Sequence, residues 1–216
     1  MSRKFEFKRN IPNMLSIFRF IVTIVIVILM TIPNKGSYIG NSGFTTIDLT
    51  CCILFIVGSI SDMLDGQIAR RCHLVSNFGK FIDPLADKAL VNSSLIMLAV
   101  TKPSLVPGII VVLMILRDLA VDGVRFLAAS KGEVIAANIY GKLKTVAQMI
   151  AIPFLFLNGW PFNYATKENT YIVTIVLICI PLVLSYISGI IYIYRGRKYI
   201  ANDKKENEVD NKEENK

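Results

Sequence analysis

The stretch that decides the fold runs from Asp62 to Lys88 and reads DMLDGQIARRCHLVSNFGKFIDPLADK. It closes one apolar run, opens the next, and carries two pairs of aspartates. Asp62 and Asp65 have i, i+3 spacing, so they lie on one face of a helix. Asp83 and Asp87 have i, i+4 spacing and share a face in the same way. Two such faces on neighbouring helices can bring all four carboxylates to one point.

Four carboxylates that converge repel each other, and a bound divalent cation relieves that repulsion. All-oxygen ligand sets favour Mg²⁺, Mn²⁺ or Ca²⁺ over zinc. The sequence therefore predicts that the four aspartates bind metal. Asp83 precedes Pro84, and an N-cap with proline at the first helical position is a second role that is compatible with ligation.

The composition excludes an ordinary soluble domain. The 216 residues are 53% apolar with a mean hydropathy of +0.53, whereas soluble domains are about 45–50% apolar even with glycine counted. A membrane-spanning helix needs about 20 residues. We expect an all-α membrane protein with six transmembrane helices, at Leu15–Pro33, Thr46–Arg70, Pro84–Val100, Leu105–Ala128, Lys144–Asn158 and Thr170–Tyr194.

The distribution of lysine and arginine predicts the orientation. The N-terminal arm, the second-to-third connection and the fourth-to-fifth connection carry four each and the C-terminal tail seven, against one in each opposite loop. Positively charged loops face the cytoplasm, so both termini are predicted to be cytoplasmic in a multi-pass cell-membrane protein. Residues 1–202 form the predicted membrane domain. Residues 203–216 are apolar only at Val209 and are predicted to be a disordered charged tail.

Polar residues gather at the helix ends that this topology places on the cytoplasmic side. Six of the ten acidic residues in 1–202 lie there, which predicts a polar, metal-containing cavity open to the cytoplasm. For a single aspartate, solvation at the interface is the simpler explanation, but the helical spacing of the pairs favours a cavity. The net charge of +8 suits anionic lipid headgroups or a phosphate-bearing substrate and does not by itself indicate nucleic acid.

The pattern D-x2-D-G-x2-A-R-x8-G-x3-D-x3-D, from Asp62 to Asp87, resembles the signature of the CDP-alcohol phosphatidyltransferase family with no position missing. The segments IPNMLSIFR (11–19), RDLAVDGVR (117–125), GKLKT (141–145) and SGIIY (188–192) are similar to members whose acceptor is glycerol 3-phosphate. The resemblance implies transfer of the phosphatidyl group from CDP-diacylglycerol to glycerol 3-phosphate, with release of CMP. It also implies a homodimer, with the active site facing the cytoplasm.

The resemblance implies two divalent ions, Mg²⁺ or Mn²⁺, held by Asp62, Asp65 and Asp83, with Asp87 touching the second ion. It makes Asp87 the candidate general base for the acceptor hydroxyl. Contacts to CDP-diacylglycerol are implied for Asn13, Ser16, Asp62, Asp65, Gly66, Ala69, Arg70, Ser76 and Gly79.

Several of these donor-side residues also suit a purely structural role. Gly66 and Ala69 allow close approach of a ligand, and helix–helix packing is the alternative. Arg70 can bind phosphate with its planar fork. For Ser76 a solvated loop position remains the alternative.

The acceptor phosphate needs fixed cations, and the resemblance assigns Arg117, Arg125, Lys142 and Lys144 to it. The alternative is the positive-inside bias itself, which requires no ligand. Arg117 could instead pair with one of two neighbouring acids, Asp118 or Asp122. Arg19, Arg125 and the basic pair of GKLKT, Lys142 and Lys144, favour a phosphorylated small alcohol.

Two rival functions follow from the same residues. The first is the same family with serine, an inositol phosphate or phosphatidylglycerol as acceptor. The second, more remote, is a divalent-cation transporter with the aspartates as a permeation site. The position of the acids at helix ends and the lack of inverted halves in the sequence disfavour the transporter.

Overall fold

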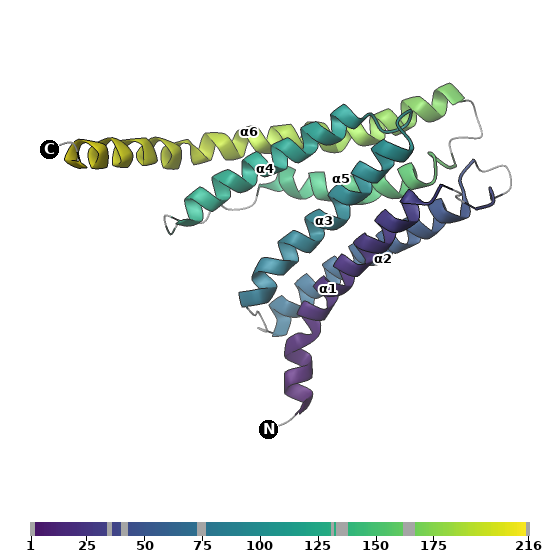
Figure 1. The fold of residues 1–216 in the computed structure, drawn as a ribbon, viewed down its shortest axis with the longest axis horizontal. Helices are drawn as coiled ribbons and strands as arrows, with labels where there is room; N and C mark the ends of the chain where they lie inside the picture. The colour runs from purple at the N-terminus through teal and green to yellow at the C-terminus, as the bar shows by residue number, and fades with distance from the viewer. Residues whose placement is uncertain are drawn as a thin grey trace. The chain divides into compact units, whose positions relative to one another are not determined.

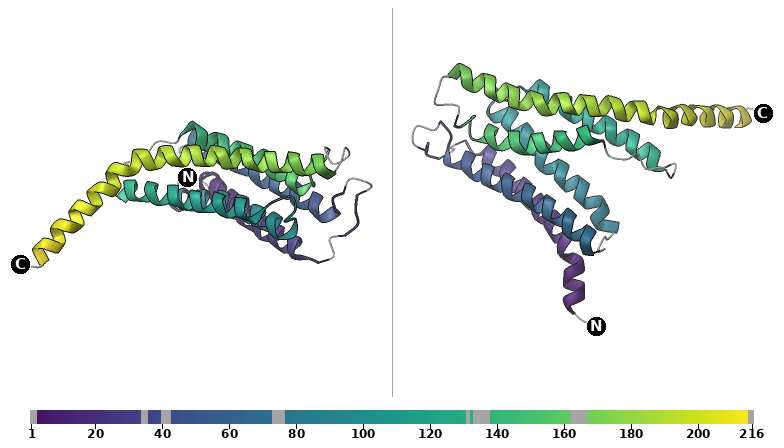
Figure 2. Two further views of the ribbon diagram at one scale, coloured as in Figure 1. Left: turned by 90° about the horizontal axis from the view of Figure 1, so that it is seen from above. Right: turned by 180° about the vertical axis from the view of Figure 1, so that it is seen from behind.

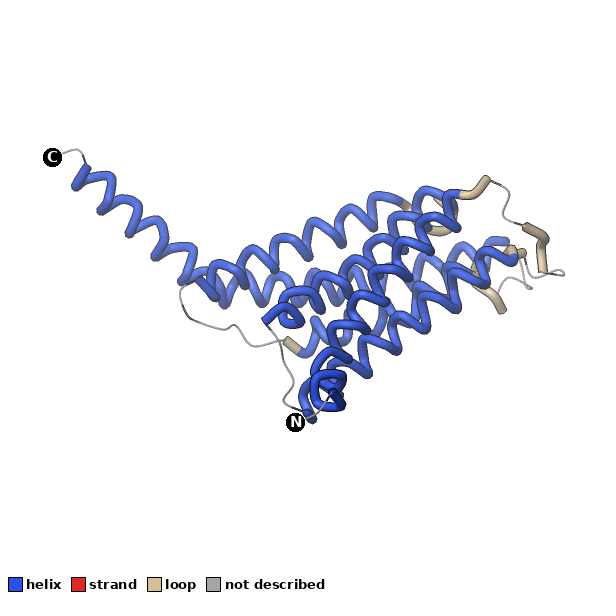
Figure 3. The backbone as a smooth tube through the Cα atoms, turned by 60° about the horizontal axis from the view of Figure 1, so that its bottom comes forward, coloured by secondary structure: helices blue, strands red, loops and turns tan. Residues whose placement is uncertain are grey.

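The computed structural model describes residues 3–33, 36–39, 43–72, 77–130, 132, 138–161 and 167–214. Side chains at 3–13, 64–81, 83–84, 167–169 and 198–214 lie outside the described part. The described backbone forms six helices (Figures 1 and 3). They are α1 (Arg3–Thr31), α2 (Thr46–Cys72), α3 (Asn77–Thr101), α4 (Gly108–Ser130), α5 (Ile139–Phe156) and α6 (Lys167–Glu214). The all-α prediction is confirmed for these residues.

The chain divides into two compact units, which are described separately. The first contains Met1–Val111 and Gln148–Ile178, and the second contains Val112–Ala147 and Cys179–Lys216. Helices α1, α2 and α3 belong to the first unit. Helices α4, α5 and α6 each contribute a segment to both units.

In the first unit, α1 packs along α2 and α3, as the two views of Figure 2 show. The face of α1 toward its neighbours buries apolar side chains such as Ile26 and Met30, together with the polar Ser16 and Arg19. Its other face exposes Ile17, Ile21, Ile24 and Ile28. Burying charge while exposing isoleucine is the arrangement expected of a helix whose outer face contacts lipid.

Within the described residues, three helical segments are long and apolar enough to cross a membrane: Met14–Thr31, Thr46–Met63 and Thr170–Arg197. These agree with three of the six predicted spans, and the chain is a membrane protein on this basis. The charged residues of α4, which include Arg117 and Asp122, interrupt its apolar run. The count of six spans and the cytoplasmic orientation stay predictions.

The backbone of the predicted tail continues α6, which ends at Glu214. Within the second unit, α6 extends past the end of α4 (Figure 1). The side chains from 198 onward lie outside the described residues. Disorder of residues 203–216 therefore stays a prediction.

A capping box begins α2. Thr45 Oγ1 accepts a hydrogen bond from the Asp48 N–H at 3.3 Å. Asp48 Oδ2 in turn accepts bonds from the Thr45 N–H and from Thr45 Oγ1, at 3.0 Å each. This reciprocal bonding satisfies backbone donors that a helix start leaves without intrahelical partners.

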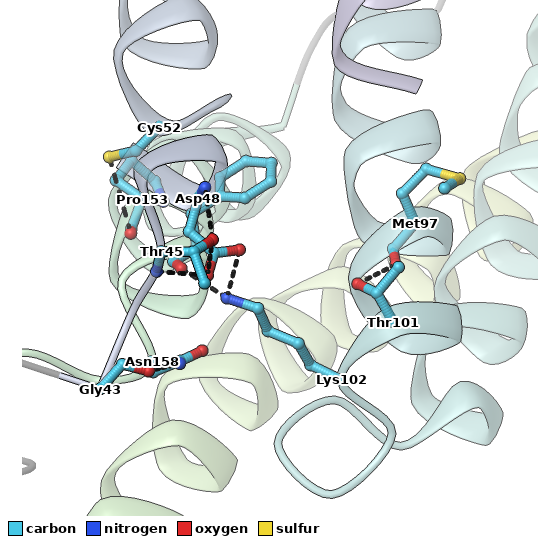
Figure 4. A network of polar contacts seen from close by, with 10 residues as sticks. Gly43, Thr45, Asp48, Cys52, Met97, Thr101, Lys102, Pro153 and Asn158 are labelled. Carbon is cyan, nitrogen blue, oxygen red and sulfur yellow. Dashed lines mark hydrogen bonds and ion pairs between the residues drawn. The ribbon is translucent and has the colours of Figure 1, made fainter. Parts of the chain in front are cut away.

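A buried lysine ties this capping box to two other helices (Figure 4). Lys102 follows the last residue of α3, and its Nζ lies 2.9 Å from Asp48 Oδ1. The same Nζ donates a hydrogen bond to the Phe156 carbonyl, at the end of α5, at 2.6 Å. The side chains of Asp48 and Lys102 are 3% and 9% exposed. Through this ion pair and this hydrogen bond, Lys102 joins the start of α2 to the ends of α3 and α5.

Lys102→Met should destabilise the protein, because it leaves Asp48 as an uncompensated buried charge. Breaking a buried pair from one side costs about 3–5 kcal/mol, so the apparent unfolding temperature should fall by roughly 10 °C. Thermal unfolding of the detergent-solubilised protein measures this. The double variant Asp48→Asn/Lys102→Met removes both charges and should regain part of the loss. An unchanged unfolding temperature in the single variant would contradict the assignment.

Candidate functional site

The four signature aspartates lie on two helices of the first unit, as predicted. Asp62 and Asp65 are within α2, and Asp83 and Asp87 are within α3. Because α3 begins at Asn77, Asp83 lies inside the helix, and the predicted N-cap role of Asp83 before Pro84 is wrong. The two helices are consecutive in the chain and contact each other. Each aspartate pair therefore lies within a helix, as its i, i+3 or i, i+4 spacing requires. The side chains described are those of Asp62 and Asp87, both half-buried.

An arginine from α1 meets the first of these aspartates. Arg19 Nη1 lies 2.6 Å from Asp62 Oδ1, and the Arg19 side chain is fully buried while that of Asp62 is 30% exposed. Ser16, one helical turn earlier on the same face, is also fully buried. A buried guanidinium is costly unless it is paired, so this contact sets how α1 packs on α2. It also orients the Asp62 carboxylate.

The sequence grouped Arg19 with the cations that favour a phosphorylated acceptor. The structure instead gives Arg19 a carboxylate partner in the signature segment. The two residues are 43 positions apart, so no local spacing could indicate the pair. The lone charge within an otherwise apolar stretch was the available signal that Arg19 needs a partner.

Most other donor-side predictions lie where side chains are not described. These are Asn13 in α1, Asp65, Gly66, Ala69 and Arg70 in α2, and Gly79 and Asp83 in α3. Ser76 lies outside the described residues altogether. Because α2 continues to Cys72, positions 62, 65, 66, 69 and 70 share one helix face. That part of the prediction is confirmed.

The chemistry of this donor set fits a hard divalent cation, since every predicted ligand is a carboxylate. Among the described side chains, no group of three or more His, Cys, Asp or Glu residues could hold a metal ion. Two of the four predicted ligands, Asp65 and Asp83, are not in that part of the chain. The metal site stays a prediction.

The second unit contains a buried charge cluster on α4 and α5. Lys144 Nζ lies 2.5 Å from both carboxylate oxygens of Asp118. Arg117 Nη1 lies 2.9 Å from Asp118 Oδ1. The side chains of Arg117, Lys144 and Asp118 are 9%, 9% and 12% exposed. Asp118 therefore holds two of the four predicted phosphate-binding residues together, and the suggested pairing of Arg117 with Asp118 is observed.

Arg117 keeps unused donors within this cluster. Its Nε and Nη2 are buried without a hydrogen-bond partner among the described residues. Gly189 of α6 makes room for it, because a Cβ at that position would lie 3.0 Å from Arg117 Nε. Buried donors without partners are rare in native proteins and point to a missing ligand or water. An anion with several acceptor oxygens would satisfy them.

Arg125, seven residues after Asp118 on α4, has a different partner. Its Nη2 donates a hydrogen bond to Tyr192 Oη at 2.5 Å, and its guanidinium carbon lies 4.6 Å from the Tyr192 ring centre. The backbone N–H of Asn138 donates to the same phenol oxygen at 3.0 Å. Tyr192 thus joins α4 to the start of α5.

Lys142 and Lys144 lie in different surroundings. Lys144 is buried on Asp118, while Lys142 is exposed. Residues at i and i+2 do not share a helix face, so the spacing itself predicts this separation. A ligand role for Lys142 stays a prediction.

The face of α6 toward this cluster was missed as a functional surface. Ser185, Ser188, Gly189 and Tyr192 follow i, i+3, i+4, i+7 spacing and are buried. The hydroxyls of Ser185 and Ser188 have no hydrogen-bond partner in the described part of the chain. Small and polar residues recurring at helical spacing within the last apolar run were the signal that could have found this face.

The arrangement combines two kinds of chemistry in a helical membrane protein. Aspartates on adjacent helices suit a metal-bound polyphosphate, and buried cations with spare donors suit an anion. Comparison with known proteins agrees with this class. The family model for CDP-alcohol phosphatidyltransferase matches residues 9–191, and the chain belongs to that family.

The relatives named CDP-diacylglycerol–glycerol-3-phosphate 3-phosphatidyltransferase include three bacterial proteins. The chain is 42% identical to the Bacillus subtilis protein over 156 residues, 71% of this chain and 80% of the relative. It is 35% identical to the Rickettsia felis protein over 192 residues, 88% and 97% of the two chains. It is 33% identical to the Haemophilus influenzae protein over 188 residues, 86% and 92% of the two chains. All the predicted site residues lie within the segment that the family matches.

Asp118→Asn should destabilise the second unit, because Arg117 and Lys144 would lose their shared counter-charge in a buried place. We expect a loss of about 3 kcal/mol, seen as a lower apparent unfolding temperature. Asp118→Glu keeps the charge and is the matched control, so it should lose less. Equal unfolding temperatures for the Asn and Glu variants would show that the carboxylate does not hold the cluster.

Proposed function

We propose that this protein transfers the phosphatidyl group of CDP-diacylglycerol to glycerol 3-phosphate, forming phosphatidylglycerophosphate and CMP. The observation that supports a phosphorylated acceptor is the buried cluster of Arg117, Asp118 and Lys144, with its unused guanidinium donors. A phosphate dianion on the acceptor supplies the oxygens that this cluster requires. The names of the relatives agree with this acceptor.

The membrane arrangement supports the same reaction. We propose six transmembrane helices with both termini in the cytoplasm, residues 1–202 as the catalytic domain, and the charged residues 203–216 as a disordered tail. In this orientation the diacyl chains stay in the bilayer while the CDP headgroup enters from the cytoplasm. The resemblance to the family also carries the proposal of a homodimer.

The donor side is proposed to bind the CDP headgroup along α2. Asn13, Ser16, Gly66, Ala69, Arg70, Ser76 and Gly79 contact the nucleotide end, beside Asp62 and Asp65. Asp62, Asp65, Asp83 and Asp87 would hold two Mg²⁺ or Mn²⁺ ions, which neutralise pyrophosphate charge when bound. The Arg19–Asp62 contact keeps one of these carboxylates oriented.

The chemical step is a direct displacement. The acceptor hydroxyl oxygen forms a bond to the lipid-bearing β-phosphorus, and the bond from that phosphorus to the oxygen of CMP breaks. Asp87, half-buried on α3, takes the hydroxyl proton, and CMP leaves with the electron pair. Holding both substrates in line supplies most of the rate enhancement.

The acceptor side is proposed to hold the phosphate of glycerol 3-phosphate with Arg117, Arg125, Lys142 and Lys144. Arg117 offers the unpartnered Nε and Nη2. Lys144 is already neutralised in part by Asp118, so its contribution is mainly to shape and orientation. Lys142 is exposed and would approach the ligand from the solvent side.

The reaction is tested by measuring CMP release from CDP-diacylglycerol and Mg²⁺ with one alcohol at a time. Release with glycerol 3-phosphate, abolished by EDTA, is expected. Asp87→Asn serves as the control: it should bind CDP-diacylglycerol and release no CMP. Release only with serine, an inositol phosphate or phosphatidylglycerol would overturn the acceptor assignment. Release with none of them, from folded protein, would revive the transporter hypothesis.

Arg125→Ala should raise the KM for glycerol 3-phosphate by about tenfold or more, because a charge-assisted contact to phosphate is lost. The KM for CDP-diacylglycerol should change far less. Initial rates with each substrate varied in turn measure both constants. Equal increases in the two constants would indicate that Arg125 has a general structural role instead.

A further inference from the structure

Tyr192 of α6 occupies an unusual position in the second unit. Its side chain is 3% exposed, and its single phenol oxygen accepts two hydrogen bonds from different elements. One comes from Arg125 Nη2 on α4 at 2.5 Å and the other from the Asn138 N–H at 3.0 Å. The proposed chemistry assigns Tyr192 no role, although Tyr192 ends the SGIIY segment (188–192).

The Asn138 contact places Tyr192 at the start of α5. Asn138 precedes the first residue of α5, and its Oδ1 accepts a hydrogen bond from the Tyr140 N–H at 3.3 Å. Its carbonyl accepts bonds from the N–H groups of Gly141 and Lys142 at 3.1 and 3.3 Å. Asn138 is therefore the residue that caps α5, the helix that carries Lys142 and Lys144.

We propose that Tyr192 is a positioning residue for the acceptor-phosphate site. Its hydroxyl fixes the guanidinium of Arg125 beside the capped start of α5. The Arg125 cation and the helix that carries Lys142 and Lys144 therefore already have their binding positions when the acceptor arrives. This inference rests on the proposed function, because it assumes that Arg125 binds the acceptor phosphate.

The hydroxyl and the ring have separable effects. The ring face attracts the guanidinium electrostatically, but stacking alone leaves the arginine free to turn over the ring. The hydrogen bond to Oη removes that freedom. An arginine has five N–H donors, so donating one to Tyr192 does not prevent phosphate binding by the others. Restricting the side chain before binding removes an ordering cost that the substrate would otherwise have to offset.

The same helix offers a matched control. Tyr194 lies two residues further on, and the guanidinium carbon of Arg197 stacks 4.3 Å from its ring centre. Tyr194 is 63% exposed, and Arg197 is not among the proposed phosphate ligands. Tyr194→Phe thus removes a phenol oxygen beside a stacked arginine without touching the proposed site.

The experiment compares Tyr192→Phe, Tyr194→Phe, Arg125→Ala and the double variant Tyr192→Phe/Arg125→Ala in the full-length protein. Tyr192→Phe keeps the ring and removes the oxygen. It should raise the KM for glycerol 3-phosphate about tenfold, while kcat and the KM for CDP-diacylglycerol stay within about twofold. Tyr194→Phe should match the wild type. In the Arg125→Ala background, Tyr192→Phe should cause no further increase.

The outcomes distinguish a failure of the Tyr192 inference from a failure of the proposed acceptor site. If Arg125→Ala raises the KM for glycerol 3-phosphate and Tyr192→Phe does not, Tyr192 is not a positioning residue and the acceptor site stands. If the two effects add fully in the double variant, Tyr192 acts independently of Arg125 and the inference is wrong. If Arg125→Ala leaves that KM unchanged, the proposed acceptor site fails and the inference fails with it.

Discussion

Charge can be buried among these helices when it is paired, and the described structure depends on that constraint. Removing an ion from water costs several kcal/mol, and a partner at hydrogen-bonding distance offsets the cost. The Arg19–Asp62 pair joins α1 to α2, and the Asp118–Lys144 pair joins α4 to α5. Each contact binds one helix to another within its unit. Apolar packing alone specifies helix partners less strictly, because the outer faces of these helices are apolar too.

The Asp48–Lys102 pair and the Arg117–Asp118 pair differ in the other partners that their side chains have among the described residues. Besides pairing with each other, Asp48 accepts hydrogen bonds from the Thr45 N–H and hydroxyl, and Lys102 donates one to the Phe156 carbonyl. Such a set of partners is expected of a structural contact. Arg117, by contrast, meets one carboxylate and retains two buried nitrogens without partners among the described residues. A ligand with negatively charged oxygens completes the second arrangement and has no place in the first. The acceptor phosphate in the proposed reaction is such a ligand.

The sequence predicted the features that arise from local periodicity. The spacing of Asp62 and Asp65 placed them on one helix face, and the helix that carries them begins at Thr46 as expected. The signature also led to the family that the comparison confirms. Contacts between distant residues could not be read in this way. The partners Arg125 and Tyr192 are 67 positions apart, and their proximity depends on how α4 and α6 pack.

The central claim is that the buried basic cluster recognises the phosphate of the acceptor. The most direct test is the ratio of kcat/KM for glycerol 3-phosphate to that for glycerol, in the wild type and in Arg117→Gln. A site with buried donors should reject the analogue that lacks the phosphate by a factor of about 10³ or more. The account predicts that Arg117→Gln lowers this ratio by at least about tenfold, through weaker use of glycerol 3-phosphate. An unchanged ratio in the variant would contradict it.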